Sequence, residues 1–187
     1  MAIASYLRRN GLCIAAGLLC IACVVFFLFP VVSLGKSMLP TLDSIQLLAG
    51  TPVFLNQDAQ IHRGDIVVVQ SGSPFRRLIK RMIAIPGDTL QIHGNVVYVN
   101  GEALDEPYLY EAMRTQDIAP MTLGEDQFFV LGDNRNISAD SRYYGLFSRA
   151  DILLTVDPQQ HPVLPVLSVA LLVGGLFCLF YLPETRK

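Results

Sequence analysis

The sequence predicts a mainly β domain placed between two membrane-spanning helices, and three observations lead to this fold class. The central part of the chain consists of short runs rich in β-branched and aromatic residues, separated by turn sequences. No amphipathic helical pattern competes with those runs. An uncharged apolar stretch long enough to cross a bilayer lies on each side. We therefore expect an antiparallel, β-barrel-like domain flanked by two transmembrane helices.

The first apolar stretch covers residues 12–34 and contains no charged side chain. A cleaved signal peptide is the alternative interpretation, with Arg8 and Arg9 as its basic start and residues 33–35 as a small-x-small triplet. The run is longer than the ~7–15 apolar residues of a usual signal-peptide core. The sequence therefore favours an uncleaved membrane anchor.

The second apolar stretch covers residues 161–183 and lacks Asp, Glu, Lys and Arg. Arg186 and Lys187 follow it, as Arg8 and Arg9 precede the first stretch. Basic residues flanking a span stay on the cytoplasmic side. We therefore expect residues 1–11 and 184–187 in the cytoplasm and residues 35–160 outside it. The chain would be a multi-pass protein of the cell membrane, in contact with the lipid bilayer.

The composition of residues 35–160 excludes several function classes. Ten Lys and Arg residues stand against fifteen Asp and Glu residues, a net charge of about −5, which is unlike a nucleic-acid-binding surface. The four cysteines, Cys13, Cys20, Cys23 and Cys178, all lie in the apolar stretches. The central domain thus has no disulfide framework or thiolate site, and no histidine pair has metal-ligand spacing. We expect no metal and no cofactor.

Six strands are predicted within the central domain. They cover residues 52–55, 65–70, 77–85, 89–92, 96–99 and 128–131. Turn sequences at 63–64, 86–88, 94–95, 100–101 and 132–134 separate them. Residues 105–127 are polar and irregular, and we expect them to form a small excursion or flap.

Ser37 is the candidate nucleophile, because it follows the first apolar stretch and would lie just outside the membrane surface. A serine hydroxyl needs a nearby base to remove its proton. His62, His93 and His161 have no carboxylate neighbour in a recognisable triad, although a triad is spatial and sequence does not exclude one. Of the three lysines, Lys36 adjoins Ser37 and Lys187 ends the chain. Lys80 is therefore the candidate base of a Ser–Lys pair.

The strand predicted around Lys80 favours this role. Alternate residues of a strand share a face, so Lys80 lies with Leu78, Met82 and Ala84. Apolar neighbours disfavour the charged ammonium and lower its pKa, and a general base must be neutral. The competing interpretation is an edge-strand lysine whose amine reaches water, which is the commoner situation for a lysine.

Four stretches together resemble the type I signal peptidases, which are membrane-bound Ser–Lys peptidases. They are residues 35–42 (GKSMLPTL), 63–67 (RGDIV), 80–88 (KRMIAIPGD) and 132–145 (GDNRNISADSRYYG). Residues 97–101 match the family's intervening hairpin. The resemblance implies a serine endopeptidase domain that removes signal peptides from exported preproteins after small residues in an Ala-x-Ala-like pattern.

The resemblance also implies a role for individual residues. Ser37 is the nucleophile, Lys80 the general base, and Ser138 the hydroxyl that orients the lysine. The backbone N–H of Ser37 contributes to the oxyanion hole. The ion pairs Arg81–Asp133 and Asp140–Arg142 brace the site. Met38, Leu42, Leu78 and Ile79 line the shallow pockets for the substrate.

Two features depart from the commonest pattern of this family. Many members have a serine two residues before the nucleophile, whereas this chain has Gly35, as in the Gram-positive-like subgroup. The second apolar stretch is absent from members with an N-terminal anchor alone. Two alternatives remain open: a dedicated relative such as a conjugation-pilus processing peptidase, and an inactive membrane-anchored β scaffold. The presence of Ser37, Lys80 and Ser138 together argues against the scaffold.

Overall fold

The computed structural model describes Gly17 and residues 30–53, 60–73 and 76–158. The chain divides into one unit of residues 1–30 with 161–187, and another of residues 31–160 that holds nearly all the described residues. Apart from Gly17 and residues 30–34, the two predicted spans lie outside the described residues. Within the described ranges, no helix has the length and apolar character needed to cross a membrane.

Strand β1 (Pro30–Leu34) occupies residues that the sequence analysis assigned to the end of the first span. Proline cannot donate the hydrogen bond that continues a helix, and its ring clashes with the preceding turn. Two valines follow, and β-branched residues favour strands. The helix expected over 12–34 therefore does not extend to residue 34.

The larger sheet has six strands in the order β1-β2-β10-β3-β4-β9. Besides β1, its members are β2 (Ile45–Pro52), β3 (Ile66–Gln70), β4 (Arg77–Ala84), β9 (Phe129–Leu131) and β10 (Ile152–Val156). The pairs β2–β10, β10–β3, β3–β4 and β4–β9 are antiparallel. Strand β4 therefore runs between β3 and β9, inside the sheet.

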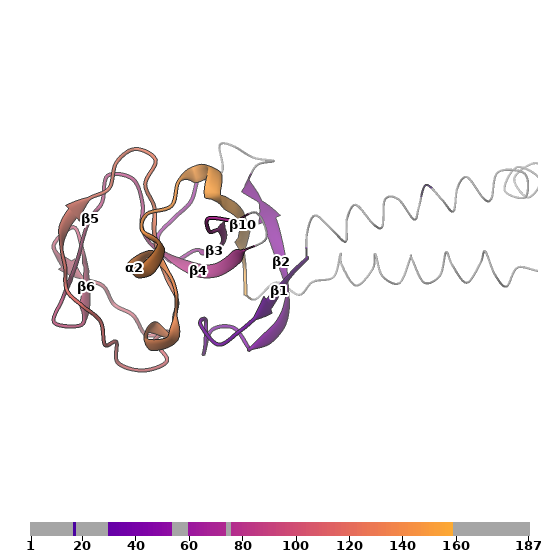
Figure 1. Ribbon diagram of the computed structural model, residues 1–187, viewed down its shortest axis with the longest axis horizontal. Helices are drawn as coiled ribbons and strands as arrows, with labels where there is room; N and C mark the ends of the chain where they lie inside the picture. Colours follow the sequence, from indigo (N-terminus) through magenta and orange to yellow (C-terminus); the bar gives the residue numbers. More distant parts are fainter. Residues whose placement is uncertain (1–16, 18–29, 54–59, 74–75, 159–187) are drawn as a thin grey trace, which may run out of the picture. The chain divides into compact units, whose positions relative to one another are not determined.

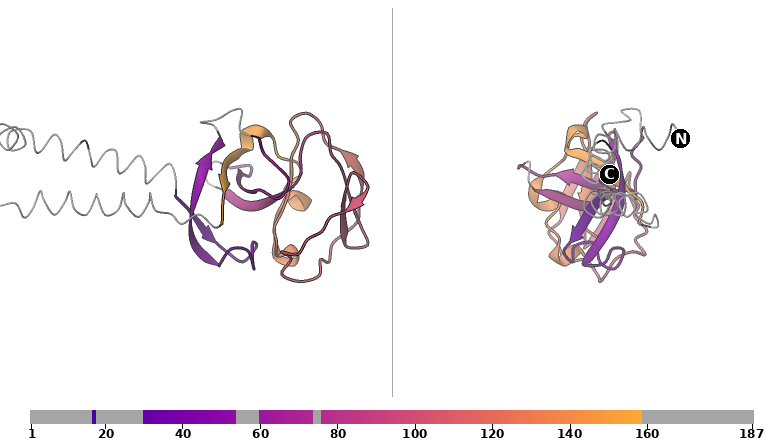
Figure 2. Two further views of the ribbon diagram at one scale, coloured as in Figure 1. Left: turned by 180° about the vertical axis from the view of Figure 1, so that it is seen from behind. Right: turned by 90° about the vertical axis from the view of Figure 1, so that its right-hand side faces the viewer.

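The smaller sheet has the order β7-β6-β5-β8. It consists of β5 (Thr89–His93), β6 (Val96–Val99), β7 (Glu102–Ala103) and β8 (Ile118–Thr122). The turn between β5 and β6 places Gly94 and Asn95 at positive φ (58° and 66°), as a two-residue hairpin turn requires. Figures 1 and 2 show β5 and β6 at one end of the unit formed by residues 31–160 and β1 and β2 at its other end.

The mainly β, antiparallel prediction is confirmed, and the described strands form no closed barrel. Among the described residues the strands form two open sheets, which end at β1 and β9 and at β7 and β8. Five predicted strands agree closely with β3, β4, β5, β6 and β9, whereas the strand predicted at 52–55 shares only Pro52 with β2. The excursion expected over 105–127 contains β8, whose sequence holds Pro120 and therefore resembles a loop. Proline is tolerated there because β8 is an edge strand.

Three short helical turns complete the described part of the chain. They are η2 (Arg135–Ile137), α2 (Ser141–Tyr144) and η3 (Arg149–Asp151). The side chain of Asp140 caps α2 by accepting a hydrogen bond from the Arg142 N–H. This cap fixes the end of the loop that follows β9.

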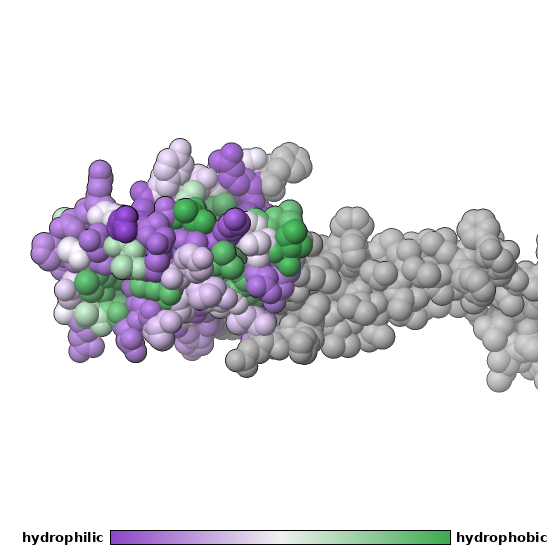
Figure 3. Space-filling view, turned by 90° about the horizontal axis from the view of Figure 1, so that it is seen from below, coloured by the Kyte–Doolittle hydropathy of each residue, from purple (hydrophilic) through white to green (hydrophobic). Residues whose placement is uncertain are grey.

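Three clusters of buried apolar side chains hold the sheets together. One joins Ile83 and Ala84 of β4 to the smaller sheet, and a second packs Met82 with Val67 and Val130. The third packs beneath the β1–β2 connection. Figure 3 shows one face of the surface, on which hydrophilic residues predominate and hydrophobic residues form small groups. Strand β4 contributes to all three clusters, so its position is fixed on both sides.

Asp88 joins the two sheets at the turn between β4 and β5. Its buried carboxylate accepts hydrogen bonds from the Arg63 guanidinium, the Ile85 N–H and the Asn100 amide. Burial alone would raise the pKa of Asp88, but these bonds together outweigh it and lower the pKa. The ionised form of Asp88 is therefore favoured by folding.

We expect Asp88→Asn to lower the free energy of unfolding at neutral pH. A carboxyl whose pKa is lowered by folding stabilises the protein above its unfolded pKa of ~3.9 and loses this contribution as the pH falls through its folded pKa. The difference between wild type and Asp88→Asn should therefore shrink below about pH 4. Denaturant unfolding of both proteins across pH tests this, and a difference that grows in acid would contradict it.

Candidate active site

Ser37 lies in the turn that connects β1 to β2. The turn is closed by hydrogen bonds from the Leu42 N–H to the Met38 carbonyl at 2.9 Å and from the Gly35 N–H to the Ser44 carbonyl at 2.9 Å. Met38 and Leu42 are buried beneath it, so their side chains anchor the turn to the core. The Ser37 side chain is left half-buried on the side that faces β4.

Lys80 lies in β4 and meets the Ser37 side chain from across this turn. Its Nζ donates hydrogen bonds to Ser37 Oγ at 2.8 Å and to the Ile79 carbonyl at 2.8 Å. Only 3% of Lys80 is exposed. Two side chains that are 43 positions apart in the sequence therefore form one part-buried polar contact.

The environment of Lys80 lowers the pKa of its amine from 10.5 to about 8. Burial is the largest cause, because removal from water penalises the charged ammonium. The carboxylates of Asp140 and Asp133 act in the opposite direction, and the Arg142 guanidinium adds to the lowering. A substantial fraction of the amine is thus neutral at mildly alkaline pH.

The loop of residues 132–140 after β9, called here the 132–140 loop, packs against the backbone of Ser37. The Asn134 N–H donates to the Ser37 carbonyl at 3.0 Å. A Cβ at Gly132 would lie 2.5 Å from the Ser37 carbonyl oxygen and 2.6 Å from Ser138 Cβ. Only glycine fits at position 132, because any side chain would push these two serines apart.

Both ion pairs expected from the sequence are present in the structure. Arg81 binds Asp133 through two hydrogen bonds, Nε to Oδ1 at 2.8 Å and Nη2 to Oδ2 at 2.6 Å. Arg142 binds Asp140 in the same way, at 2.9 and 2.8 Å. The Thr41 hydroxyl adds a short hydrogen bond to Asp133, which ties the Ser37 turn to this network.

The predicted hydrogen bond between Ser138 and Lys80 is not formed. Ser138 Oγ is buried and has no hydrogen-bond partner, and Asn134 Oδ1 is likewise buried without a partner. The Lys80 amine is instead directed to Ser37 and to the Ile79 carbonyl. Ser138 nevertheless lies close to the site, because its side chain and the Ser37 carbonyl both contact Gly132.

A pocket of about 200 Å³ opens beside the Ser37–Lys80 pair. Its lining residues are Ser33, Leu34, Gly35, Ser37, Met38, Arg77, Leu78, Ile79 and Lys80. Three of the four predicted pocket residues are therefore in place. Leu42 is the exception, because it is fully buried in the core under the turn.

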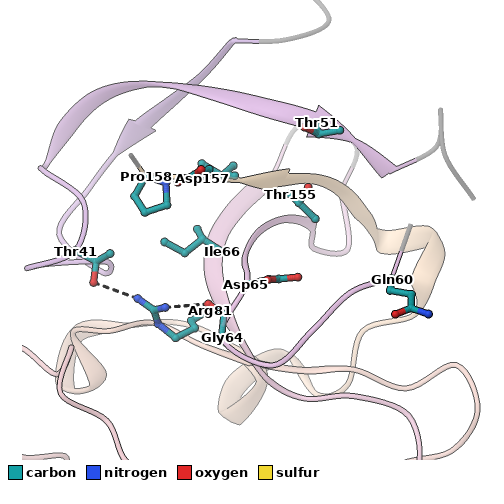
Figure 4. Close-up of a pocket in the computed structure, with 11 residues that line it drawn as sticks. Thr41, Thr51, Gln60, Gly64, Asp65, Ile66, Arg81, Thr155, Asp157 and Pro158 are labelled. Carbon is teal, nitrogen blue, oxygen red and sulfur yellow. Dashed lines mark hydrogen bonds between the residues drawn. The ribbon is translucent and has the colours of Figure 1, made fainter. Parts of the chain in front are cut away.

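A larger pocket, of about 470 Å³, contains neither Ser37 nor Lys80 (Figure 4). Arg81 points into it and donates to the Thr41 hydroxyl at 3.2 Å and to the Gly64 carbonyl at 2.9 Å. The contact between Ser37 and Lys80 lies at the smaller pocket, so we place the candidate site there. Over the described ranges, no group of three or more His, Cys, Asp or Glu side chains is placed to hold a metal ion.

Three residues of this site were not predicted from the sequence: Thr41, Gly132 and Asn134. All three lie within the stretches 35–42 and 132–145 that carry the resemblance, so the sequence indicated that these segments belong to the site. Their functions depend on contacts between distant segments, which no local pattern reveals.

Comparison with known proteins identifies the family. The family model described as "Signal peptidase, peptidase S26" matches residues 6–158. "Signal peptidase I P" of Bacillus subtilis subsp. natto is 37% identical over 138 residues, which cover 68% of this chain and 74% of that protein. "Signal peptidase I U" of Bacillus subtilis (strain 168) is 34% identical over 163 residues, covering 79% and 86%. A solved signal peptidase I from Enterococcus faecalis V583 is 33% identical, with a TM-score of 0.47, over 53% of this chain and 98% of that one.

These matches place the chain among the serine endopeptidases. More particularly, it belongs to the signal peptidase family, peptidase S26. Signal peptidase I activity, expected from the four sequence stretches, is thus supported by comparisons that cover most of the chain.

We expect Gly132→Ala to lower kcat by at least ~100-fold. The added Cβ would lie too close to the Ser37 carbonyl oxygen, so the Ser37 backbone must move, and a small displacement of a reacting group is enough for such a loss. Gly124→Ala is the matched control: its Cβ would meet only the flexible side chain of Gln127, at 3.3 Å, in an exposed turn. Steady-state cleavage of a preprotein by both variants tests this. Equal kcat values for the two variants would contradict the account.

Proposed function

We propose that Ser37 and Lys80 are the catalytic dyad of a membrane-bound signal peptidase I. The single observation that carries this proposal is the 2.8 Å contact between Ser37 Oγ and a buried lysine amine whose pKa is lowered to about 8. A neutral amine has a lone pair that can accept the serine proton. The family membership supports assigning this chemistry to peptide hydrolysis.

The reaction begins when the Ser37 hydroxyl donates its proton to Lys80 and Oγ attacks the carbonyl carbon of the scissile peptide bond. The resulting oxyanion accepts a hydrogen bond from the Ser37 N–H. Lys80 then gives the proton to the departing amine, and the carboxyl group of the signal peptide remains esterified to Ser37. A water molecule, deprotonated by Lys80, hydrolyses this ester and releases the signal peptide.

The substrate would bind as an extended chain in the groove between β1 and β4. Strand β9 pairs with β4 from Arg81 onward, so residues 77–80 have no β9 partner in the register of the described strands. An added peptide strand can bond to such an edge. The small pocket lined by Met38, Leu78 and Ile79 suits the short side chains of an Ala-x-Ala sequence.

The membrane arrangement is part of the same proposal. Residues 12–29 and 161–183 would anchor the chain in the cell membrane, with residues 35–160 outside the cytoplasm. Signal peptides of exported preproteins end at that membrane surface, and Ser37 follows closely after the first anchor. A dedicated relative with a single substrate is the alternative, and a panel of preproteins distinguishes the two.

Substitution of Ser37 or Lys80 tests the dyad directly. Ser37→Ala and Lys80→Arg should both insert into membranes and lose nearly all cleavage of a preprotein with an Ala-x-Ala site. Arginine keeps the positive charge but cannot act as a base, because its pKa exceeds ~12. The neighbouring Lys36 is exposed, so Lys36→Arg is the matched control and should remain active. Cleavage by Lys80→Arg near the wild-type rate would make another residue the base, with His62 the first to test.

The pH dependence of cleavage tests the role of the Lys80 amine. Because the amine must be neutral to accept a proton, kcat/KM should rise with pH and level off above an apparent pKa near 8. A free lysine would place this midpoint near ~10.4. Rates measured between pH 6 and pH 10 test the assignment. An acidic limb centred near pH 6.5 would point to a histidine instead.

A further inference from the structure

The segment that joins β7 to β8, residues 104–117 and called here the connector, lies against the 132–140 loop. The Tyr110 N–H donates to the Asp133 carbonyl at 3.3 Å. The Arg114 N–H donates to Asn136 Oδ1 at 2.8 Å, and Asn136 Nδ2 donates to the Ala112 carbonyl at 3.0 Å. A flap was predicted here from the sequence, over residues 105–127. These bonds instead attach the connector to the 132–140 loop at several points.

Glu106 of the connector forms an ion pair with Arg135 of the loop. Arg135 is 1% exposed, and its Nη1 donates to Glu106 Oε2 at 3.0 Å while Nη2 forms a second, shorter bond. Arg135 Nε donates to the Gly132 carbonyl at 2.9 Å. The guanidinium therefore connects Glu106 directly to the glycine that contacts Ser37 and Ser138.

Tyr108 of the connector links the same carboxylate to the other side of the site. Its hydroxyl donates to Glu106 at 3.1 Å, and the Arg81 guanidinium lies 3.9 Å above the centre of its ring. Burial, and then the charge of Glu106, raise the pKa of the Tyr108 hydroxyl, so it remains a donor. Arg81 is the residue next to Lys80 and the partner of Asp133.

We propose that Glu106 and Tyr108 are positioning residues for the Ser37–Lys80 pair. Glu106 holds the 132–140 loop through Arg135, and Tyr108 supports Arg81 behind Lys80. The loop in turn holds the Ser37 carbonyl through the Asn134 N–H at 3.0 Å. This inference rests on the proposed dyad and adds a part of the chain that the dyad mechanism does not use.

The energetics of buried ion pairs favour a role in geometry. The desolvation of two charges offsets most of their attraction, so replacing such a pair by apolar residues is often neutral or stabilising. Removing one partner alone is strongly destabilising. The Glu106–Arg135 pair is therefore weak evidence for a role in stability. The bond from Arg135 to the Gly132 carbonyl, by contrast, needs a guanidinium held at this point.

The experiment uses the full chain in detergent and a preprotein with an Ala-x-Ala site. Glu106→Gln leaves the Arg135 charge without its counterion, and we expect kcat to fall at least ~10-fold with KM within ~2-fold, because the substrate pocket is untouched. The paired variant Glu106→Leu with Arg135→Met should recover the stability of the wild type. Its kcat should stay at least ~10-fold low, because the support of Gly132 is not recovered.

A return of kcat to the wild-type value in the stable paired variant would overturn the inference, since the pair would then serve stability alone. Asp88→Asn is the matched control, because it removes another buried carboxylate that bonds an arginine but does not touch the 132–140 loop. It should lose stability while kcat per folded molecule is unchanged. Ser37→Ala separates the two proposals. Full activity of Ser37→Ala would contradict the proposed dyad. Loss of activity in Ser37→Ala together with wild-type activity in the paired variant would contradict only the positioning role of Glu106.

Tyr108 gives a second measurement that applies even if the paired variant does not fold. Tyr108→Phe keeps the ring under Arg81 and should retain kcat within ~3-fold. Tyr108→Leu removes the aromatic face under the Arg81 guanidinium and should lower kcat ~10-fold at unchanged KM. A near-wild-type kcat in Tyr108→Leu would overturn the positioning role of Tyr108.

Discussion

The contact between the Lys80 amine and the Ser37 hydroxyl depends on the removal of Lys80 from water. A lysine in water is protonated and cannot accept a proton at neutral pH. Here the amine is held inside the domain by its strand, because β4 is paired with β3 along residues 77–81 and with β9 from Arg81 onward. Met82, which follows on the same strand face, is fully buried. The fold thus supplies, before any substrate binds, the neutral amine that the proposed mechanism requires.

Burial of an amine also has a cost, and the charged groups around the site balance it. Asp133 and Asp140 favour the ammonium, and each carboxylate is occupied by an arginine, Arg81 or Arg142. The same pairs fasten the 132–140 loop, which holds the carbonyl of Ser37. Electrostatics and geometry therefore depend on the same side chains, and a change to one pair affects both the pKa of Lys80 and the position of Ser37.

The sequence predicted the parts of this structure that local patterns encode. Strands β3 to β6 follow from β-branched runs and from turns such as Gly94-Asn95, and the burial of Lys80 follows from its strand face. Strand β8 was missed because Pro120 resembles a loop signal and its pairing with β5 is tertiary. The contacts of Glu106 and Gly132 were not predicted because they too join segments that are distant in the sequence. The predicted bond between Ser138 and Lys80 is absent, and the amine instead donates to Ser37 and to the Ile79 carbonyl of its own strand.

The pKa of the Lys80 amine itself is the most direct test of the central claim. The chain has three lysines, Lys36, Lys80 and Lys187, so competitive labelling of amines across pH, read by peptide mass spectrometry, resolves each of them. Lys36 is exposed and provides an internal reference. The account predicts that the labelling of Lys80 titrates with a pKa near 8 in the folded protein and returns to ~10.4 on denaturation. A value for folded Lys80 equal to that of Lys36 would contradict it.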